Sequence, residues 1–323
     1  MKLGVVVLNW NGKDVTPRCL DSISRSSCPP DQVVVVDNAS TDGSVDLVRG
    51  GYPHVVVIVN DSNLGFAEGN NVGIRYLLER AFDLLLLLNN DTVLEPESLC
   101  ELKRAAQAHP AAAYGAAIYE LAAPGSLWYG GGTISRLTLD ARHATAPADA
   151  RGGARPTDFI TGCCLMFRAD ALRRIGLLDK DFFAYYEDVD WCLRAKASGD
   201  RLLYVPDATV HHDVSHTFRR AGAQLERAAQ YPWARSRPLV LYLAYRSRLL
   251  LARKHAGGTL HFAFLAARRL ARAALHIGML ALAGRIRQAR AVVDGTRDGL
   301  QWPPQPVRVD RYFSTRPAPA ERR

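Results

Sequence analysis

The sequence contains no uninterrupted apolar run of the roughly 18 residues that a membrane-spanning helix requires. Its best stretch, in the C-terminal part, is interrupted by Arg268, Arg269 and Arg272. The apolar run at residues 3–8 is too short for a signal peptide and lacks a small-residue cleavage site, so we interpret it as a first strand. We therefore expect a cytoplasmic protein that contacts a membrane only from the surface, at the inner face of the plasma membrane.

The sequence also has no C-x-x-C pair. Its six cysteines lie at irregular spacings: Cys19, Cys28, Cys100, Cys163, Cys164 and Cys192. Such a pattern is typical neither of a disulfide framework nor of a zinc site. We expect reduced thiols.

Several nucleotide-binding signatures are missing too. There is no G-x-G-x-x-G dinucleotide fingerprint and no Walker A loop, and nothing resembles an RRM, KH or zinc-finger motif. These absences exclude the common dinucleotide and ATP loops, and we expect no nucleic-acid partner. The oligomeric state is left open by the sequence.

Acidic residues are scarce only in the last part of the chain. Residues 1–230 carry 23 basic and 28 acidic side chains, a net charge of −5, whereas residues 231–323 carry 18 basic and 4 acidic, a net charge of +14. We place a domain boundary between residues 222 and 223. The C-terminal region is rich in leucine, alanine and arginine and predicts two or three helices broken at the glycine pair 257–258. Its charge predicts contact with an anionic partner, such as lipid headgroups.

Four short apolar runs precede this region, at residues 3–8, 33–36, 55–59 and 84–88. Helix-like segments separate them, and the last run, "LLLLL", shows neither helical nor alternating periodicity. An unbroken run of this length is typical of a strand that is buried on both faces. The alternation predicts an α/β protein with a mainly parallel sheet and helices on both faces.

Polar residues follow each run: Asn9, Asp37 with Asn38, Asn63, and Asn89-Asn90-Asp91. Because ligands of parallel sheets bind at the carboxyl ends of the strands, we expect these clusters to share one edge. Asp91 with Thr92 offers the oxygen ligands that Mg²⁺ or Mn²⁺ prefers. Each cluster also has a purely structural explanation, since Ser40 or Thr41 caps a helix equally well and "NND" suits a turn.

Three other segments carry candidate functional groups. Glycines at 65, 69 and 73 share one helix face, which suits either a phosphate site or close packing on the sheet. "YYEDVDWCLRA" at 185–195 concentrates acids at a helix start, where the helix dipole alone favours them. Its aromatic frame suits a wall for a sugar. "VHHDVSH" at 210–216 offers histidines for a metal.

Taken in order, "DNASTDGS", "NLGFAEGNN", "LLLLNNDT", "GCCLMFR", "YEDVDWCLR" and "VHH" resemble the bacterial family 2 glycosyltransferases of GT-A fold, in their rhamnosyltransferase-like branch. The resemblance covers residues 1 to about 220. It implies that Asp188 is the catalytic base beside Glu187, and that Asp91 and His212, or failing it His211, hold Mg²⁺ or Mn²⁺. It also implies a nucleotide-sugar site and an acceptor wall. The nucleotide-sugar site comprises Asn9, Asp37, Asn38, Gly65, Asn70, Asn71 and Asn89. The acceptor wall comprises Tyr186 and Trp191.

The resemblance implies inverting transfer of a sugar, with dTDP-rhamnose the first candidate donor, to a hydroxyl of a cell-envelope or lipid-linked glycan. One departure concerns the metal motif, where an amide, Asn89, replaces its first carboxylate. Two other functions stay open: a sugar nucleotidyltransferase, which usually has a glycine-rich loop where this chain has "LNWNG", and a non-catalytic carbohydrate-binding module. The basic tail is either a pair of helices on an anionic bilayer or a solvated helical cap.

Overall fold

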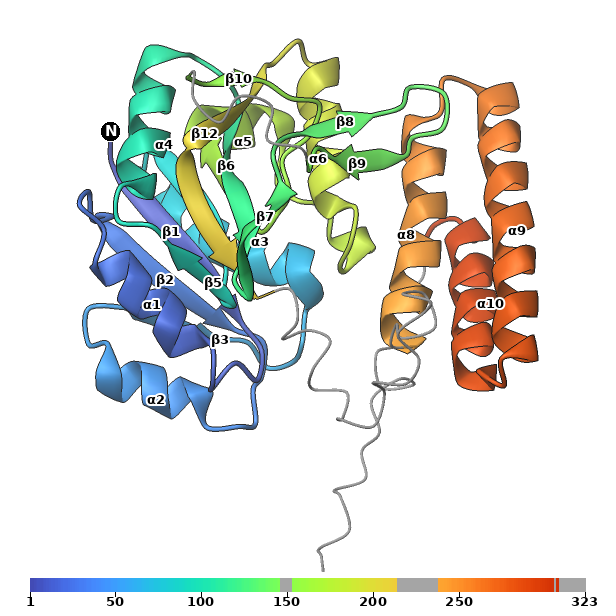
Figure 1. The fold of residues 1–323 in the computed structure, drawn as a ribbon, viewed down its shortest axis with the longest axis horizontal. Coiled ribbons are helices and arrows are strands. Elements are labelled where there is room, and N and C mark those ends of the chain that lie inside the picture. Colours follow the sequence, from blue (N-terminus) through green and yellow to red (C-terminus); the bar gives the residue numbers. More distant parts are fainter. Residues whose placement is uncertain (146–152, 214–237, 305, 308–323) are drawn as a thin grey trace, which may run out of the picture. The chain divides into compact units, whose positions relative to one another are not determined.

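The structure is a computed structural model of the 323-residue chain (Figure 1). It describes every residue except 146–152, 214–237, 305 and 308–323. Its contacts divide the chain into two compact units, residues 1–220 and 221–323, and each unit is described by itself. The boundary that we expected after residue 222 falls in a segment outside the described residues.

Four parallel strands form one side of a ten-stranded sheet, in the order β3-β2-β1-β4. They are β1 (Leu3–Asn9), β2 (Gln32–Asp37), β3 (Val56–Val59) and β4 (Leu84–Asn89), close to the four apolar runs. The five leucines of β4 are all buried because the strand lies in the middle of the sheet. The direction of the strand order reverses between β1 and β4, which is where sheets of this kind bind ligands.

The remaining six strands of the sheet pair in both parallel and antiparallel directions. Beyond β4 lie β11 (Cys164–Arg168), β6 (Ala113–Glu120), β12 (Leu202–His212) and β10 (Arg155–Pro156). Two shorter additions are β5 (Thr92–Leu94), which pairs with β12, and β7 (Ala123–Tyr129), which pairs with β6. A separate hairpin joins β8 (Gly132–Ile134) to β9 (Ala141–His143). The loops and short strands that composition predicted for residues 122–156 thus include a second small sheet.

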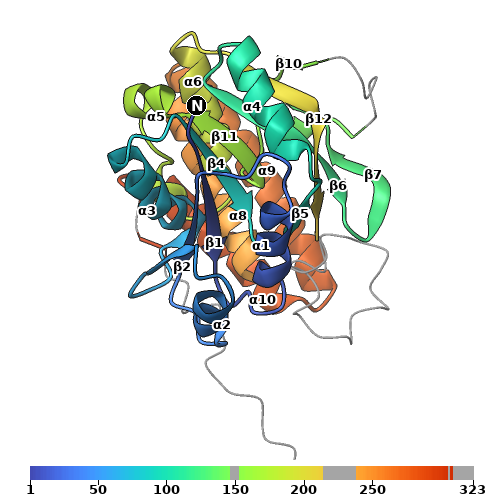
Figure 2. The ribbon, with the colours of Figure 1, turned by 90° about the vertical axis from the view of Figure 1, so that its left-hand side faces the viewer.

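Helices cover both faces of the sheet, as Figures 1 and 2 show. One face carries α1 (Thr16–Ser24) and α4 (Ser98–Ala108); the other carries α3 (Gly65–Glu79), α5 (Ala169–Ile175) and α6 (Glu187–Ala197). The remaining elements are α2 (Ser44–Gly51) beside β3 and the short helix η1 (Lys180–Phe182). Glycines allow α3 to lie close to the sheet; at Gly73, for example, a Cβ would collide with Val6.

The expectation of reduced thiols is wrong for two cysteines. Cys28 and Cys100 form a disulfide, with their Cα atoms 5.2 Å apart, that joins the loop after α1 to the first turn of α4. The two residues are 72 positions apart in the sequence, so only the packing of α1 and α4 on the same face of the sheet brings them together. The other four cysteines are free and buried. Burial raises the pKa of Cys19 to about 12, so this thiol is unreactive at neutral pH.

The helical unit contains α8 (Pro238–His255), α9 (Thr259–Leu282) and α10 (Ile286–Leu300), which pack on one another (Figure 1). The predicted break at Gly257 and Gly258 is confirmed, and Gly258 has a positive φ of 124°. Helices α8 and α10 can approach closely because Gly295 has no side chain; a Cβ at this position would collide with the backbone of Tyr242. Among the described residues, no helix is both long and apolar enough to cross a bilayer.

Candidate active site

A cavity of about 560 Å³ lies where the end of β4 faces the first turn of α6. Its apolar wall is aromatic and includes Phe66, Trp128, Phe159, Tyr185 and Tyr186. Its polar groups include Asn89, His143, Thr161, Glu187, Asp188 and His212. An aromatic cavity with a few converging polar groups is the usual form of a small-molecule site.

Asp188 lines this cavity from the first turn of α6. Its Oδ2 accepts a hydrogen bond of 2.9 Å from the Gly162 amide, and its Oδ1 accepts one of 2.8 Å from the Val189 amide. Burial raises the pKa of Asp188, and these two amides oppose that rise. A carboxylate with a raised pKa is a stronger proton acceptor, so the geometry suits a general base.

Glu187, the residue before it, behaves differently. Its side chain is only 5% exposed, and its Oε2 has no hydrogen-bond partner among the described residues. Burial, reinforced by the neighbouring charge of Asp188, raises the pKa of Glu187 well above its usual range. Burial thus raises the pKa of both carboxyl groups, but two backbone amides oppose the rise for Asp188, while Oε2 of Glu187 has no donor among the described residues. Glu187 therefore favours its protonated form more strongly than Asp188 does.

The backbone that presents this pair is strained. Phe183, Tyr185 and Tyr186 all have φ between 62° and 73°, a region that non-glycine residues rarely adopt. The carbonyl of Phe183 accepts hydrogen bonds from the amides of Phe66 and Ala67, at 2.6 and 3.1 Å. These bonds fix the loop before α6 to the first turn of α3 and so hold the strained conformation in place.

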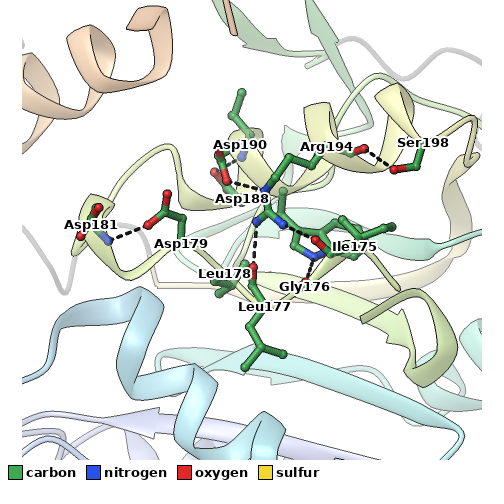
Figure 3. Close-up of polar contacts among 12 residues, drawn as sticks. Ile175, Gly176, Leu177, Leu178, Asp179, Asp181, Asp188, Asp190, Arg194 and Ser198 are labelled. Carbon is green, nitrogen blue, oxygen red and sulfur yellow. Dashed lines mark hydrogen bonds and ion pairs between the residues drawn. The ribbon is translucent and has the colours of Figure 1, made fainter. Parts of the chain in front are cut away.

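A buried ion pair supports α6 from below (Figure 3). Asp190 is fully buried and its Oδ2 lies 2.9 Å from Nε of Arg194. The same guanidinium donates to the carbonyls of Ile175 and Leu177, at 2.9 and 2.8 Å. This pair therefore anchors the helix to the chain that follows α5, a structural role that the sequence also allowed.

Trp191 belongs to that support and not to the cavity. It is fully buried, its Nε1 donates a hydrogen bond of 2.8 Å to the carbonyl of Gly176, and its ring packs edge-on against Phe167. Expected as part of the acceptor wall, it lies in the core, one turn further along α6 than Glu187 and Asp188, where the helix packs on Phe167 and Gly176. Tyr186, the other expected wall residue, does line the cavity.

Asp91 and His212 meet at the edge of the same cavity. Nε2 of His212 lies 3.2 Å from Oδ1 of Asp91, because β12 pairs with β5, next to Asp91. Strand alternation points His211 the other way, where its Nε2 lies 2.9 Å from Oε1 of Glu95. Oδ1 of Asp91 and Nδ1 of His212 are buried and lack hydrogen-bond partners within the described part of the chain.

This pair fits a divalent cation. A carboxylate and an imidazole are both ligands for Mn²⁺ or Mg²⁺, and such ions keep several sites for water or phosphate oxygens. No third His, Cys, Asp or Glu joins the pair in the part of the chain that the structure describes. Two protein ligands therefore leave most of the coordination sphere for other groups.

The polar ends of β1 and β2 form a closed network. Nδ2 of Asn9 donates to Oδ1 of Asp37 at 2.6 Å, and the amide and hydroxyl of Ser40 also donate to Asp37. Asn38 donates to the carbonyl of Gly65 at 3.0 Å. All three predicted nucleoside contacts, Asn9, Asp37 and Asn38, are buried. In this structure their side chains hold the loops at the strand ends, and contact with a nucleoside stays a prediction.

The predicted residues of α3 are similarly engaged. Gly65 has a positive φ of 80° and a Cβ there would collide with Phe183. Asn71 exchanges two hydrogen bonds with the backbone of Leu178, and Asn70 donates to the carbonyl of Phe66. Gly65 and Asn71 thus hold α3 against the segment that precedes α6, whereas the bond of Asn70 stays within α3. Only Asn89 among the predicted nucleotide-sugar residues lines the cavity.

Comparison with known proteins identifies the fold and the family. The sequence model described as "Glycosyltransferase like family 2" matches residues 2–230. The chain belongs to glycosyltransferase family 2. It is 30% identical over 241 residues to the N-acetylglucosaminyl-diphospho-decaprenol L-rhamnosyltransferase of Mycobacterium tuberculosis, covering 68% of this chain and 78% of that protein. The rhamnosyltransferase WbbL of Escherichia coli K12 is 24% identical over 172 residues, covering 49% and 65%.

A solved structure shows the same fold as this family 2 glycosyltransferase. The mannosyltransferase PcManGT from Pyrobaculum calidifontis, in complex with GDP-Man and Mn²⁺, aligns with a TM-score of 0.54 at 16% identity. The alignment covers 93% of this chain and 87% of that one. The expected GT-A fold, the rhamnosyltransferase-like branch and the class of nucleotide-sugar-dependent glycosyltransferase are thus confirmed.

Several residues that line the cavity of this family 2 enzyme were not predicted from the sequence, among them Trp128 and His143. Their ring centroids are 4.5 Å apart, and Trp128 also lies edge-on to His212 at 5.0 Å. Nδ1 of His143 lies 3.1 Å from the carbonyl of Trp128. Because a carbonyl only accepts, Nδ1 carries the proton and Nε2 keeps its lone pair. Both residues come from the segment at 122–156, where the sequence offers no motif or spacing that would single them out.

Proposed function

We propose that this enzyme is an inverting transferase that moves a sugar from a nucleoside diphosphate donor to a hydroxyl of a cell-envelope or lipid-linked glycan. dTDP-rhamnose is the first candidate donor. Two relatives support this choice, because one is named as an L-rhamnosyltransferase of N-acetylglucosaminyl-diphospho-decaprenol and another as a rhamnosyltransferase.

One observation carries the proposal: Asp188 faces the cavity with both oxygens held by backbone amides. Only one lone pair of each oxygen is used by the amides, so an acceptor hydroxyl can still donate to the same carboxylate. The raised pKa of Asp188 makes it a stronger base than an exposed aspartate.

The reaction then balances as a single displacement. Asp188 accepts the proton of the acceptor hydroxyl as that oxygen forms its bond to the anomeric carbon of the donor sugar. The bond from the anomeric carbon to the diphosphate oxygen breaks on the opposite side, and the electron pair leaves with the nucleoside diphosphate. Attack and departure on opposite faces invert the anomeric configuration.

The leaving diphosphate gains negative charge, and Asp91 with His212 is the pair that would hold a divalent cation beside it. A bound Mg²⁺ or Mn²⁺ would supply neutralisation of that charge. Asn89 and Asn90 stand before Asp91 as amides, so they leave only one carboxylate of this segment for the ion. Asn90 instead donates to Oγ1 of Thr16 at 3.0 Å and steadies the turn.

The aromatic wall suits the sugar rings of donor and acceptor. Tyr185, Tyr186 and Trp128 present ring faces or edges to a cavity that also contains carboxyl and imidazole groups. Sugars bind through apolar C–H faces and ring hydroxyls, so they match such a mixture. We place the acceptor on this wall, with Tyr186 and Trp128 in contact with it.

A donor panel tests the proposal. The full chain is incubated with Mn²⁺, a polyprenyl-diphosphate-linked N-acetylglucosamine acceptor, and dTDP-rhamnose, a UDP-sugar or a GDP-sugar in turn. We expect product with one donor only, and NMR of the product should show the anomeric configuration opposite to that of the donor. Retained configuration would overturn the inverting mechanism, and product with a UDP- or GDP-sugar alone would overturn the choice of donor.

A further inference from the structure

Helix α9 exposes an apolar face along its whole length. Leu260, Leu275 and Leu282 are 88%, 67% and 92% exposed, and the face between them is completed by Phe264, Leu270 and Met279. Arg272 is the one charged residue among the exposed positions of α9. Single exposed apolar side chains are ordinary on protein surfaces, but a row of them along about 36 Å of helix marks an interaction surface.

The packing of the helical unit does not account for this face. Leu265, Ala273 and Leu280 lie on the opposite side of α9, where they are buried and the helix packs on α8 and α10. The core of the unit is therefore satisfied by one side of α9, and the exposed leucines add nothing to it. A helix that is apolar on both sides is expected to contact a second apolar surface in addition to the core of its own unit.

The net charge of the helical unit indicates which partner covers the exposed face of α9. Residues 238–304 contain eleven basic and two acidic residues, a net charge of +9. A second copy of this unit would bring the same positive charge against the face and be repelled. A bilayer with anionic lipids attracts it instead, at roughly 1 kcal/mol for each basic residue near the surface.

We propose that α9 is an interfacial helix that lies flat on an anionic bilayer. Its exposed row of leucines, with Phe264 and Met279, enters the boundary between headgroups and acyl chains. Basic residues that include Arg272, Arg287 and Arg290, all exposed, contact the lipid headgroups. An in-plane orientation follows from the absence of a spanning helix in the described residues and from the one-sided exposure.

This inference deepens the proposed function, on which it rests only for its biological sense: a lipid-linked acceptor would be held at the surface where α9 binds. The binding itself needs neither donor nor acceptor. It can therefore fail while sugar transfer is found, and the reverse is also possible.

Vesicle co-sedimentation of the full chain tests the proposal at low salt. The probes are vesicles of phosphatidylcholine alone and of equal parts phosphatidylcholine and phosphatidylglycerol. We expect binding to the anionic vesicles only. The triple variant Leu260→Ser, Leu275→Ser, Leu282→Ser should bind at least about tenfold more weakly, because each lost leucine removes buried apolar area. Leu137→Ser is the matched control, since Leu137 is 63% exposed but lies between β8 and β9.

Folding of the triple variant is checked by its thermal unfolding, which should match the wild type because all three leucines are exposed. A third variant, Arg287→Gln with Arg290→Gln, should weaken binding to the anionic vesicles while keeping the apolar face. Equal binding by wild type and triple variant would overturn the proposal, as would no binding by the wild type. Light scattering that shows a wild-type dimer, converted to monomer in the triple variant, would assign the face to a second copy.

Discussion

The amide of Gly162 donates a hydrogen bond of 2.9 Å to Oδ2 of Asp188, across 26 positions of sequence. Gly162 precedes β11, and Asp188 lies in the first turn of α6, so the bond links the segment before this central strand to the helix that carries the proposed base. With the Val189 amide on the other oxygen, the carboxylate has one orientation in the cavity. A fixed orientation matters because a base must meet the proton within hydrogen-bond distance.

Replacement of that carboxylate by an amide removes the base while keeping the size of the side chain. Asp188→Asn should therefore lower kcat by about 10² to 10⁴, the usual contribution of a positioned base. Donor binding should persist, because Asp188 is not among the groups placed at the diphosphate. Calorimetric titration of the nucleoside diphosphate, beside turnover assays, separates the two effects. Undiminished turnover would remove Asp188 from its role.

Glu187→Gln should raise the stability of the protein at neutral and alkaline pH. Because burial raises the pKa of Glu187, the folded protein keeps this proton at pH values where the unfolded chain has lost it. Stability is therefore lost as pH rises above the unfolded pKa, and Gln, which cannot ionise, avoids that loss. The variant should match the wild-type Tm near pH 4 and exceed it near pH 8. A Tm difference that does not grow with pH would contradict the protonated state.

His143 should tune the base from across the cavity. Burial lowers the pKa of His143, so its ring takes up a second proton only on the acid side; there its charge lowers the pKa of Asp188, and removal of the ring should raise that pKa further. The acid limb of the pH profile of kcat/KM reports the free base, and His143→Gln should shift this limb to higher pH. A variant whose activity falls equally at all pH values would indicate a purely structural ring. Asp188→Asn, measured in parallel, identifies the residual rate that does not depend on the base.

The metal pair gives a prediction with a built-in control. Asp91→Asn and His212→Ala should each remove the Mn²⁺-dependent part of the thermal shift produced by dTDP, while His211→Ala should leave it intact. The wild-type shift should be large, since a ligand at about 100 times its Kd adds roughly 2.7 kcal/mol of stability. The control is sharp because His211 is adjacent in sequence but lies against Glu95. Loss of the shift in all three variants would point to damage of β12 instead.

Sequence patterns predicted the sheet, the strand ends and the position of Asp188, because buried runs and polar strand termini are local features. They did not reveal which polar side chains face a cavity. Asn71 and Trp191 belong to motifs that were predicted to form the site, yet their hydrogen-bond partners are backbone atoms of Leu178 and Gly176. The partnership of Cys28 with Cys100 likewise depends on how α1 and α4 pack, which no spacing encodes.

Arg194 tests the idea that the motif around Asp188 is half catalytic and half structural. Arg194→Leu removes the guanidinium that pairs with the buried carboxylate of Asp190, and breaking a buried ion pair in this way typically costs about 3 to 5 kcal/mol. It also removes the hydrogen bonds from Arg194 to the carbonyls of Ile175 and Leu177, which hold α6 against the end of α5. We expect a large fall in Tm by calorimetry. Arg104→Leu, which breaks an exposed pair with Glu101 in α4, should cost less than about 1 kcal/mol. Equal effects of the two variants would show that the ion pair of Asp190 with Arg194 does not stabilise α6 more than an exposed pair would.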